Sequence, residues 1–273
     1  MAEPFQLKHE TFFDIQMKSD VAHNPVVAGF STRHGGFSDK PFQSLNLGLH
    51  VNDNPNDVVR NRIKLAEALG TTLDQWVFAE QVHGKEIQKV SAGDRGKGST
   101  IMKTGMIGKD GLYTKDRDTV LALAFADCVP VFFSAPGHSI VGIVHAGWKG
   151  SVLGIARDMV ELWKQDEGIP VEDIKVWIGP SIQQCCYEVD ERVISNVDKV
   201  ADSRYSPYTR KDSEDKFMLS LQRLNQQLIL QTGIPEKNIQ VSDHCTSCEV
   251  STFFSHRKEK GQTGRMLGFI KLL

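Results

Sequence analysis

Short strand-like runs that do not alternate regularly with helices are the feature that most constrains the fold. Runs rich in β-branched or aromatic residues, bounded by Gly, Pro, Asn or Asp, span residues 26–32, 76–82, 120–127, 139–146, 175–179, 239–242, 252–255 and 266–271. Apolar residues recur at helical spacing over residues 56–69, 150–164, 190–201 and 219–232. Because strands dominate and no regular strand–helix–strand alternation appears, the pattern predicts an α/β (α+β) sandwich. In such a fold, mixed β-sheets are flanked by helices.

The composition is that of an ordinary globular protein, with 40% apolar residues among 273. No shift in composition divides the chain, so we expect residues 1–273 to form a single domain. The polar stretch 92–109 is predicted to be a mobile loop, and the stretch 202–215 a lid or an insertion.

The formal net charge of −2 gives no strong field toward nucleic acid or membranes. No apolar run approaches the roughly 20 residues of a membrane span. No signal-peptide pattern opens the chain, and its five cysteines form an odd set. These features predict reduced thiols in a soluble, cytoplasmic protein.

Three residues able to bind a metal stand at the ends of apolar strand-like runs. They are His83 in QVHG, Cys128 in ADCVP and His145 in VHAGW. Strand ends that open into tight turns allow side chains to converge on a rigid scaffold. Two imidazoles and a thiolate suit Zn²⁺, with a fourth position left open, and they also suit copper.

Two other interpretations of these residues remain open. Taken singly, a His or Cys near a strand end is more often a packed structural residue. Cys128 beside an imidazole would also serve as a thiolate nucleophile in a Cys-His hydrolase. Asp127 would then orient a histidine or simply cap a turn.

Short motifs along the chain resemble the signatures of the laccase-domain family. They lie at residues 31–36 (STRHGG), 81–84 (QVHG), 126–130 (ADCVP), 145–150 (HAGWKG), 179–182 (GPSI), 186–189 (CYEV) and 254–257 (FSHR). This family is also called multicopper polyphenol oxidoreductase, peptidoglycan-editing factor and purine nucleoside phosphorylase. The resemblance implies that His83, Cys128 and His145 are the metal-binding and catalytic residues. It also implies a fold similar to the Cys-His deamidase domain of a bacterial cytotoxic factor.

The ligand count excludes a laccase in the multicopper sense. Such an enzyme holds a trinuclear copper cluster mainly through His-X-His pairs, and none of the nine histidines forms such a pair. Oxidation of polyphenols at a single copper ion stays open.

The activity that the resemblance favours is metal-dependent phosphorolysis of adenosine, inosine and S-methyl-5'-thioadenosine, with adenosine deamination as a side activity. Phosphate would be the co-substrate, and Zn²⁺ the metal, with Cu²⁺ as the alternative. Phosphate needs an anion pocket, to which arginine and glycine-rich turns are suited. The candidates for binding phosphate or nucleoside are Arg33, His34, Asn46, Lys149 and Arg257, with Arg265 as a further cation. Arg33, which is followed by His34-Gly35-Gly36, is the best single candidate for phosphate. Any one arginine is nevertheless more often a surface cation, and Asn46 could hydrogen-bond the nucleoside or only stabilise its turn.

Two further activities compete with phosphorolysis. Deamination needs a proton carrier, for which Glu80 and Asp127 are the candidates. The pattern of the nucleobase deaminases, His-X-Glu with Pro-Cys-X-X-Cys, is not present. An amidase that edits peptidoglycan precursors would use the same three residues, and we rank it second. A non-enzymatic role, in metal binding or as a septum-associated partner, ranks third.

The remaining cysteines give a weak signal. Cys245 and Cys248 have the spacing of half a zinc site, but no second pair accompanies them at finger spacing, so we interpret them as buried thiols in a turn. Cys185 and Cys186 are expected to pack near the wall of the site. No glycine-rich dinucleotide motif or P-loop is present, so the sequence predicts no NAD, FAD or ATP.

Overall fold

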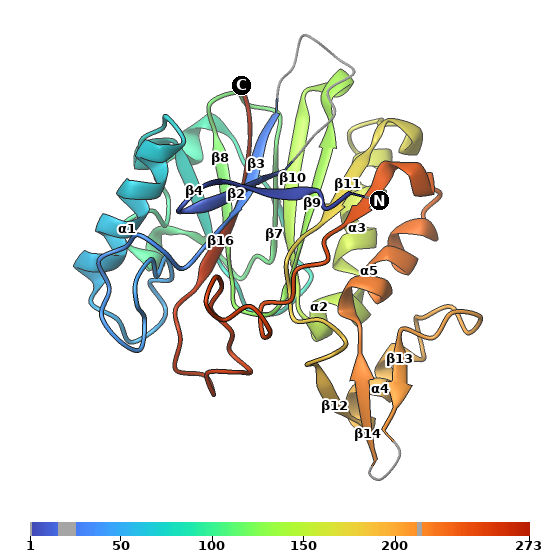
Figure 1. Ribbon diagram of the computed structural model, residues 1–273. Helices are drawn as coiled ribbons and strands as arrows, with labels where there is room; N and C mark the ends of the chain where they lie inside the picture. The colour runs from blue at the N-terminus through green and yellow to red at the C-terminus, as the bar shows by residue number, and fades with distance from the viewer. Residues whose placement is uncertain (1, 16–25, 212–214) are drawn as a thin grey trace.

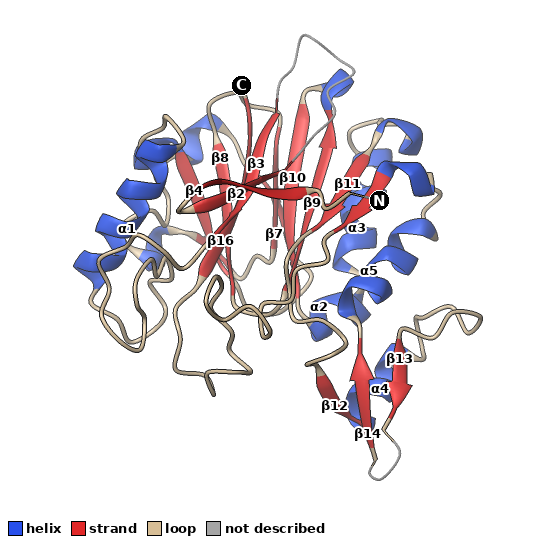
Figure 2. Cartoon of the chain, viewed as in Figure 1, coloured by secondary structure: helices blue, strands red, loops and turns tan. Residues whose placement is uncertain are grey.

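Two mixed β-sheets face each other, and helices cover their outer sides (Figures 1 and 2). This is seen in a computed structural model that describes residues 2–15, 26–211 and 215–273. The first sheet has the order β1 (Phe5–His9), β2 (Phe12–Ile15), β3 (Val26–Ser31), β16 (Met266–Leu272), β8 (Val120–Phe125), β4 (Trp76–Glu80), β6 (Met106–Ile107). The second has the order β15 (Ile239–Val241), β11 (Lys175–Ile178), β9 (Val129–Ala135), β10 (Ile140–Ala146), β7 (Gly111–Thr114), β5 (Ile87–Lys89). A small third sheet has the order β12 (Glu188–Asp190), β14 (Lys216–Leu219), β13 (Tyr208–Arg210).

The helices complete a layered sandwich. The α-helices of the described residues are α1 (Pro55–Ala68), α2 (Trp148–Leu153), α3 (Ile155–Gln165), α4 (Glu191–Val197) and α5 (Leu221–Leu230). Short 3₁₀ helices are η1 (Leu73–Gln75), η2 (Ala92–Asp94), η3 (Met102–Thr104), η4 (Pro136–His138), η5 (Val171–Asp173) and η6 (Glu236–Asn238). In Figure 1, α1 covers the first sheet, while α3 and α5 cover the second. The predicted sandwich of mixed sheets flanked by helices is therefore confirmed.

Apolar side chains fill the space between the sheets. Phe125 of β8, Phe132 of β9 and Ile143 of β10 are essentially inaccessible to solvent and belong to one cluster. Burying each such side chain stabilises the fold by roughly 1.5–3 kcal/mol. This core fixes the two sheets against each other. The loops at their edges therefore start from a rigid frame.

The strand directions bring several loops to one end of the sandwich. Strands β4 and β8 run parallel, so both end at the same edge of the first sheet. Strands β9 and β10 are antiparallel, and the start of β9 pairs with the end of β10 through His145–Pro130 and Ala146–Val129. Strand β10 packs against β8. The ends of β4, β8 and β10 and the start of β9 therefore meet at this end.

Two sequence predictions about elements were wrong. The helix expected over residues 150–164 is two helices, because Gly154 adopts a left-handed φ of 85° between α2 and α3. The strand expected over residues 252–255 is a turn, in which the amides of Thr252 and Phe253 bond to the carbonyl of Glu249. Phe253 and Phe254 are buried, so their apolar character reflects loop packing and not a sheet ladder.

The two stretches predicted as loops contain some regular structure. Residues 92–109 include η2, η3 and β6, and the guanidinium of Arg62 donates to the carbonyls of Gly98 (2.7 Å) and Ser99 (2.8 Å). Residues 202–215 include β13, although positions 212–214 lie outside the described residues. Within the described part of the chain, no helix has the length and apolar character needed to cross a bilayer.

Candidate active site

His83, Cys128 and His145 come together where the two sheets meet. His83 follows β4, Cys128 lies in the turn between β8 and β9, and His145 is the penultimate residue of β10. Their ligand atoms all lie within 4.8 Å of one another. The two imidazole rings stand edge to face, at 82°, with centroids 4.8 Å apart. His145 is buried, Cys128 half-buried and His83 exposed, so the group opens toward solvent on one side.

The backbone at this site adopts conformations that are unusual for residues with side chains. His83 has a φ of 60° and Asp127, next to Cys128, has a φ of 85°. Such conformations cost energy and persist where the surroundings enforce them, often at functional sites. Here the enforcing groups are two buried carboxylates, Asp110 and Asp127.

Asp110 orients two of the three residues. One oxygen, Oδ1, accepts from Nδ1 of His145 at 2.8 Å and from the amide of His83 at 3.0 Å. The other, Oδ2, accepts from the amides of Val82 (3.1 Å) and Gly84 (2.7 Å). Burial raises the pKa of Asp110, but the His145 ring and these amides outweigh it, so the pKa lies below its usual value. An ionised Asp110 fixes the His145 tautomer that leaves Nε2 facing Cys128.

Asp127 holds the loops around the site. Its Oδ1 accepts from the hydroxyl of Thr246 and its Oδ2 from the amide of Arg257, both at 2.7 Å. Both carboxylate oxygens are thus bound to neighbouring loops. Asp127 therefore ties distant loops to the turn that carries Cys128, and Asp110 is the carboxylate that orients a histidine.

The thiol and the buried imidazole form a charge pair. Burial raises the pKa of Cys128, but the positive charge of His145 and hydrogen bonds from both histidines lower it to about 6. Burial lowers the pKa of His145, but Cys128 and Asp110 raise it to about 9. At neutral pH the site therefore holds a thiolate, which is both the metal-ligating and the nucleophilic form of cysteine.

The residues present fit a metal ion of the zinc or copper type. Two imidazole nitrogens and a thiolate converge, and Asp110 supplies the outer carboxylate that metal-bound histidines usually have. A glycine leaves the space around them clear, since a Cβ on Gly147 would lie 3.0 Å from Sγ of Cys128 and 3.2 Å from Cδ2 of His83. The site has room for an ion but none for a further side chain.

A cleft of about 520 Å³ opens over these three residues. Its wall carries two guanidinium groups, from Arg257 and Arg265, and two further imidazoles, from His50 and His256. Burial and the neighbouring Arg265 lower the pKa of His50 to about 4, and the same two effects lower the pKa of His256. Both rings are therefore neutral at neutral pH, and the positive charge of the wall comes from the arginines.

The structure separates the other predicted site residues. Arg257 lines the cleft, donates to the carbonyl of Glu188 at 2.7 Å and lies 5.1 Å from the Tyr187 ring centroid. Asn46 is buried and accepts from the amide of Arg265 at 2.9 Å, so it positions that arginine. Glu80 lines the cleft as well.

Arg33, His34 and Lys149 lie outside the described lining of the cleft. The guanidinium of Arg33 is bound by Glu259 at 3.0 Å and by the carbonyl of Val250 at 2.7 Å. His34 and Lys149 are exposed at the surface. The geometry favours Arg257 and Arg265 over Arg33 for an anion.

Sequence reasoning missed Asp110, His50 and the place of His256. Asp110 stands between a lysine and a glycine, a setting typical of an ordinary turn, and only the fold shows its four donors. His256 belongs to the FSHR motif, which could have drawn attention to it. His50 lies four residues after Asn46 in a segment of turns and carried no signal of its own.

The fold and the site together define a class of proteins. Its members are α/β/β/α sandwiches in which a thiolate and two imidazoles lie at the base of a cleft lined by arginines. Within this class the chain belongs to the laccase-domain family. A family model described as multi-copper polyphenol oxidoreductase laccase matches residues 27–273. The predicted membership is therefore confirmed.

Relatives and solved structures agree with this assignment. The chain is 50% identical over 245 residues to purine nucleoside phosphorylase YlmD of Geobacillus stearothermophilus, covering 90% of this chain and 89% of the relative. It is 44% identical to the protein of the same name from Bacillus subtilis, covering 98% and 96% of the two chains. The structure of the hypothetical protein YfiH from Bacillus licheniformis matches with a TM-score of 0.95 and 46% identity over 99% of both chains.

Proposed function

We propose that the protein is a metal-dependent purine nucleoside phosphorylase that acts on adenosine, inosine and S-methyl-5'-thioadenosine. The observation that carries the proposal is the joint placement of the Cys-His group and two arginines in one cleft. The relatives named purine nucleoside phosphorylase support it. The cleft volume of about 520 Å³ lies within the range of small-molecule sites.

Arg257 and Arg265 bind phosphate in this proposal. Guanidinium groups suit phosphate because they offer planar, paired donors with a permanent charge. Both arginines are held in place by the protein. Asn46 fixes the backbone of Arg265, and Asp127 fixes that of Arg257.

Phosphorolysis joins a phosphate oxygen to C1' of the ribose as the bond from C1' to the purine nitrogen breaks. The purine leaves with the electron pair of that bond and takes up the proton that the attacking phosphate hydroxyl loses. Glu80 moves this proton, and neutral His50 offers one N–H donor and one acceptor to the base. His83, Cys128 and His145 would hold zinc, or copper as the alternative, and a metal bound there would supply Lewis-acid stabilisation of negative charge. We also propose adenosine deamination as a side activity of this cleft, in which a water replaces the amino group of the base, the amino group leaves as ammonia, and Glu80 carries the proton between them.

The test is turnover of adenosine by the purified protein with and without phosphate, followed by chromatography. We expect adenine and ribose 1-phosphate only when phosphate is present. Cys128→Ala should abolish turnover, and Arg265→Met should raise the KM for phosphate at least tenfold. Arg60→Met, which removes an exposed arginine from α1, serves as the control and should leave both constants unchanged. Equal turnover without phosphate would contradict the proposal.

One observation favours a second candidate function. Cys128, His145 and Asp110 stand in the order of a nucleophile, its imidazole partner and an orienting carboxylate, and the two residues form a thiolate–imidazolium pair at neutral pH. This arrangement suits amide hydrolysis, as in the editing of peptidoglycan precursors. Release of L-serine from a muropeptide, together with no purine product from any nucleoside, would favour it over phosphorolysis.

A further inference from the structure

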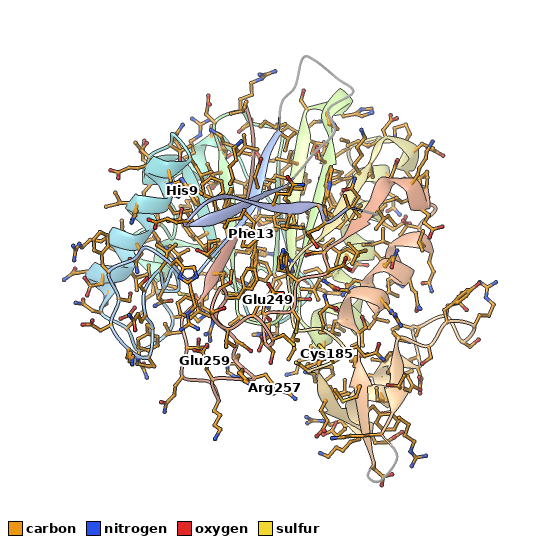
Figure 3. All side chains as sticks on the ribbon, in the orientation of Figure 1. His9, Phe13, Cys185, Glu249, Arg257 and Glu259 are labelled. Carbon is orange, nitrogen blue, oxygen red and sulfur yellow. The ribbon has the colours of Figure 1, made fainter. Side chains whose placement is uncertain are left out.

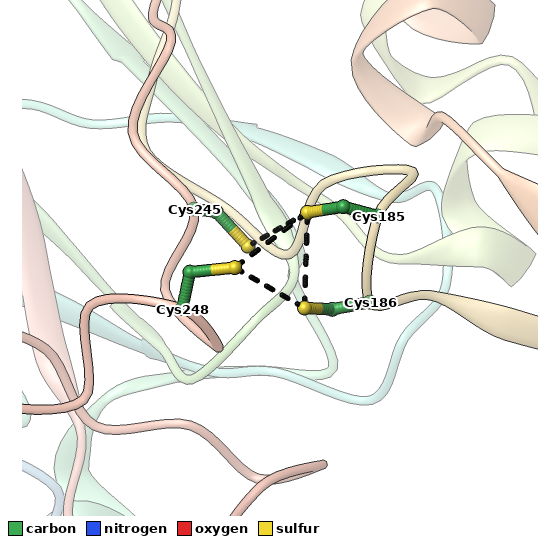
Figure 4. A group of neighbouring side chains, drawn as sticks. All are labelled: Cys185, Cys186, Cys245 and Cys248. Atoms are coloured by element: carbon green, nitrogen blue, oxygen red, sulfur yellow. Dashed lines mark hydrogen bonds between the residues drawn. The ribbon is translucent and has the colours of Figure 1, made fainter.

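Four of the five cysteines form a second cluster away from the Cys-His group (Figure 4). It is called here the four-cysteine cluster and consists of Cys185, Cys186, Cys245 and Cys248. The two pairs come from loops about 60 residues apart in the chain. No companion pair for Cys245 and Cys248 stands at finger spacing in the sequence, and the fold provides one. The prediction that they are buried thiols holds for Cys245 and is wrong for Cys248, which is exposed.

The four sulfur atoms stand at the corners of a compact group. Sγ of Cys185 lies 3.7 Å from each of the other three sulfurs, and Sγ of Cys186 lies 3.4 Å from that of Cys248. All four lie within 4.8 Å of one another. In a tetrahedral zinc site with Zn–S bonds of about 2.3 Å, neighbouring sulfurs are about 3.8 Å apart. The distances between the four sulfur atoms therefore match those around a zinc ion bound at their centre.

Local structure explains why neighbouring cysteines can face the same centre. The amides of Cys186 and Tyr187 both bond to the carbonyl of Gln183, at 3.0 Å each, which curls this segment into a turn. The amide of Gln183 in turn donates to Sγ of Cys245 at 3.4 Å. Donors of this kind stabilise a thiolate ligand and are typical of the surroundings of metal-bound sulfur.

Hydrogen bonds also fix the loop that carries Cys245 and Cys248. The carboxylate of Glu249 accepts from the amide of Cys245 at 3.0 Å and from the ring of His244 at 2.9 Å. The amide of Thr246 donates to the carbonyl of Ser181 at 3.1 Å, which ties the two loops together. The cluster is thus preorganised on both sides before any ion binds.

We propose that the four-cysteine cluster binds one zinc ion as a structural site. Four thiolates complete the coordination of zinc and leave no open position, which is typical of structural sites and not of catalytic ones. Two pairs of ligands from separate loops also match the way structural zinc joins distant parts of a chain. Cys185 and Cys248 are exposed, which gives an ion a path of entry.

This zinc site would fasten one wall of the cleft. Cys186 is followed by Tyr187, which lines the cleft and lies against Arg257. Thr246, between the two cysteines of the second loop, donates to Asp127 beside Cys128. Figure 3 shows Cys185 and Arg257 on loops below the strands of the two large sheets. An ion joining these loops would hold β12, which begins at Glu188, to the body of the protein.

The test is metal content, measured on protein purified under reducing conditions with zinc and desalted. We expect two zinc ions per chain, one for each of the two ligand groups. The double variant Cys185→Ser, Cys248→Ser should retain one ion, and Cys128→Ala should retain the other. Both changed positions in the double variant are exposed, and circular dichroism checks that this variant folds.

Cobalt substitution tells the two sites apart without any activity assay. Thiolate-to-cobalt charge transfer grows with the number of cobalt–sulfur bonds, so Cys128→Ala should keep most of the near-ultraviolet absorption. The double variant should lose most of it. If the double variant fails to fold, Cys186→Ser replaces it in the same comparison.

Three results would overturn the zinc proposal. The first is a metal content of one zinc ion per chain that is lost only in Cys128→Ala. The second is a cobalt spectrum of the double variant that is the same as that of the wild type. The third is the presence of two disulfides among the four cysteines in reduced, metal-loaded protein. Since none of these depends on nucleoside turnover, the proposal stands or falls separately from the phosphorylase function.

Discussion

Replacing Asp110 by asparagine tests whether the carboxylate behind His145 holds the active site together. The amide oxygen of the introduced asparagine can keep the bonds of Oδ1 to the His145 ring and the His83 amide. Its amide nitrogen then faces the amides of Val82 and Gly84, which lose their acceptor. A fully buried donor left without a partner costs roughly 1–3 kcal/mol. These two amides are only part-buried, because Val82 is 58% exposed, so water replaces part of the lost bonding and the two together cost roughly 1–3 kcal/mol. Loss of the charge also weakens the orientation of the histidine, an effect worth about 10–100-fold in metal affinity or activity.

The assay pairs thermal unfolding with zinc competition and adenosine phosphorolysis. Asp173→Asn is the matched control, because Asp173 also accepts from a histidine ring, that of His138 at 2.9 Å, but on the surface. We expect Asp110→Asn to lower the melting temperature, the zinc affinity and kcat together, while Asp173→Asn leaves all three close to their wild-type values. Zinc affinity and kcat within twofold of the wild type in Asp110→Asn would refute the reasoning.

Two further predictions follow from particular contacts. Gly147→Ala should lower zinc affinity and turnover at least tenfold, because its Cβ would lie 3.0 Å from Sγ of Cys128, whereas Gly137→Ala, with no atom within 4 Å, should have no effect. Normal zinc binding in Gly147→Ala would show that the site tolerates a side chain there. Glu167 is bound by Lys89 (2.6 Å), Lys115 (3.1 Å) and the hydroxyl of Tyr113 (3.1 Å). Burial raises its pKa, but these partners outweigh burial and lower it. The resulting stabilisation is present above the unfolded pKa of roughly 4.3 and is lost as the pH falls through the lower folded pKa. Glu167→Gln should therefore be less stable than the wild type at pH 7, by no more than about 1 kcal/mol given the exposed lysines, and equally stable in strong acid. Urea unfolding at both pH values checks this, and a difference that persists in acid would contradict it.

Much of the fold could be predicted from local patterns, and the errors have physical causes. The strand β10 and the helix α1 lie within a residue or two of their predicted limits, because apolar periodicity and flanking turn residues mark both. Strand β9 was missed because its sequence, VPVFFSA, contains a proline near the start and does not alternate. Proline is tolerated at that position because it stands at the beginning of the strand.

The sequence likewise identified some residues of the candidate site correctly and others wrongly. The motifs around His83, Cys128 and His145 identified three residues that the structure brings within 4.8 Å. Arg33 also stood in a motif, yet it is absent from the described lining of the cleft, and its guanidinium binds Glu259 and backbone carbonyls of distant loops. A motif shows that a residue matters and does not distinguish a ligand-binding arginine from one that ties loops together.

The sequence by itself determined the mixed-sheet sandwich, the family and the three members of the Cys-His group. The sandwich follows from the periodicity of apolar residues, and the family and the three residues follow from short contiguous motifs. Only the tertiary structure decided that Asp110 orients His145, that Arg265 belongs to the cleft, and that four cysteines gather into one cluster. The physical reason is that these relations join residues tens of positions or more apart. Their partners are set by how strands pair and sheets pack, and no local pattern records that.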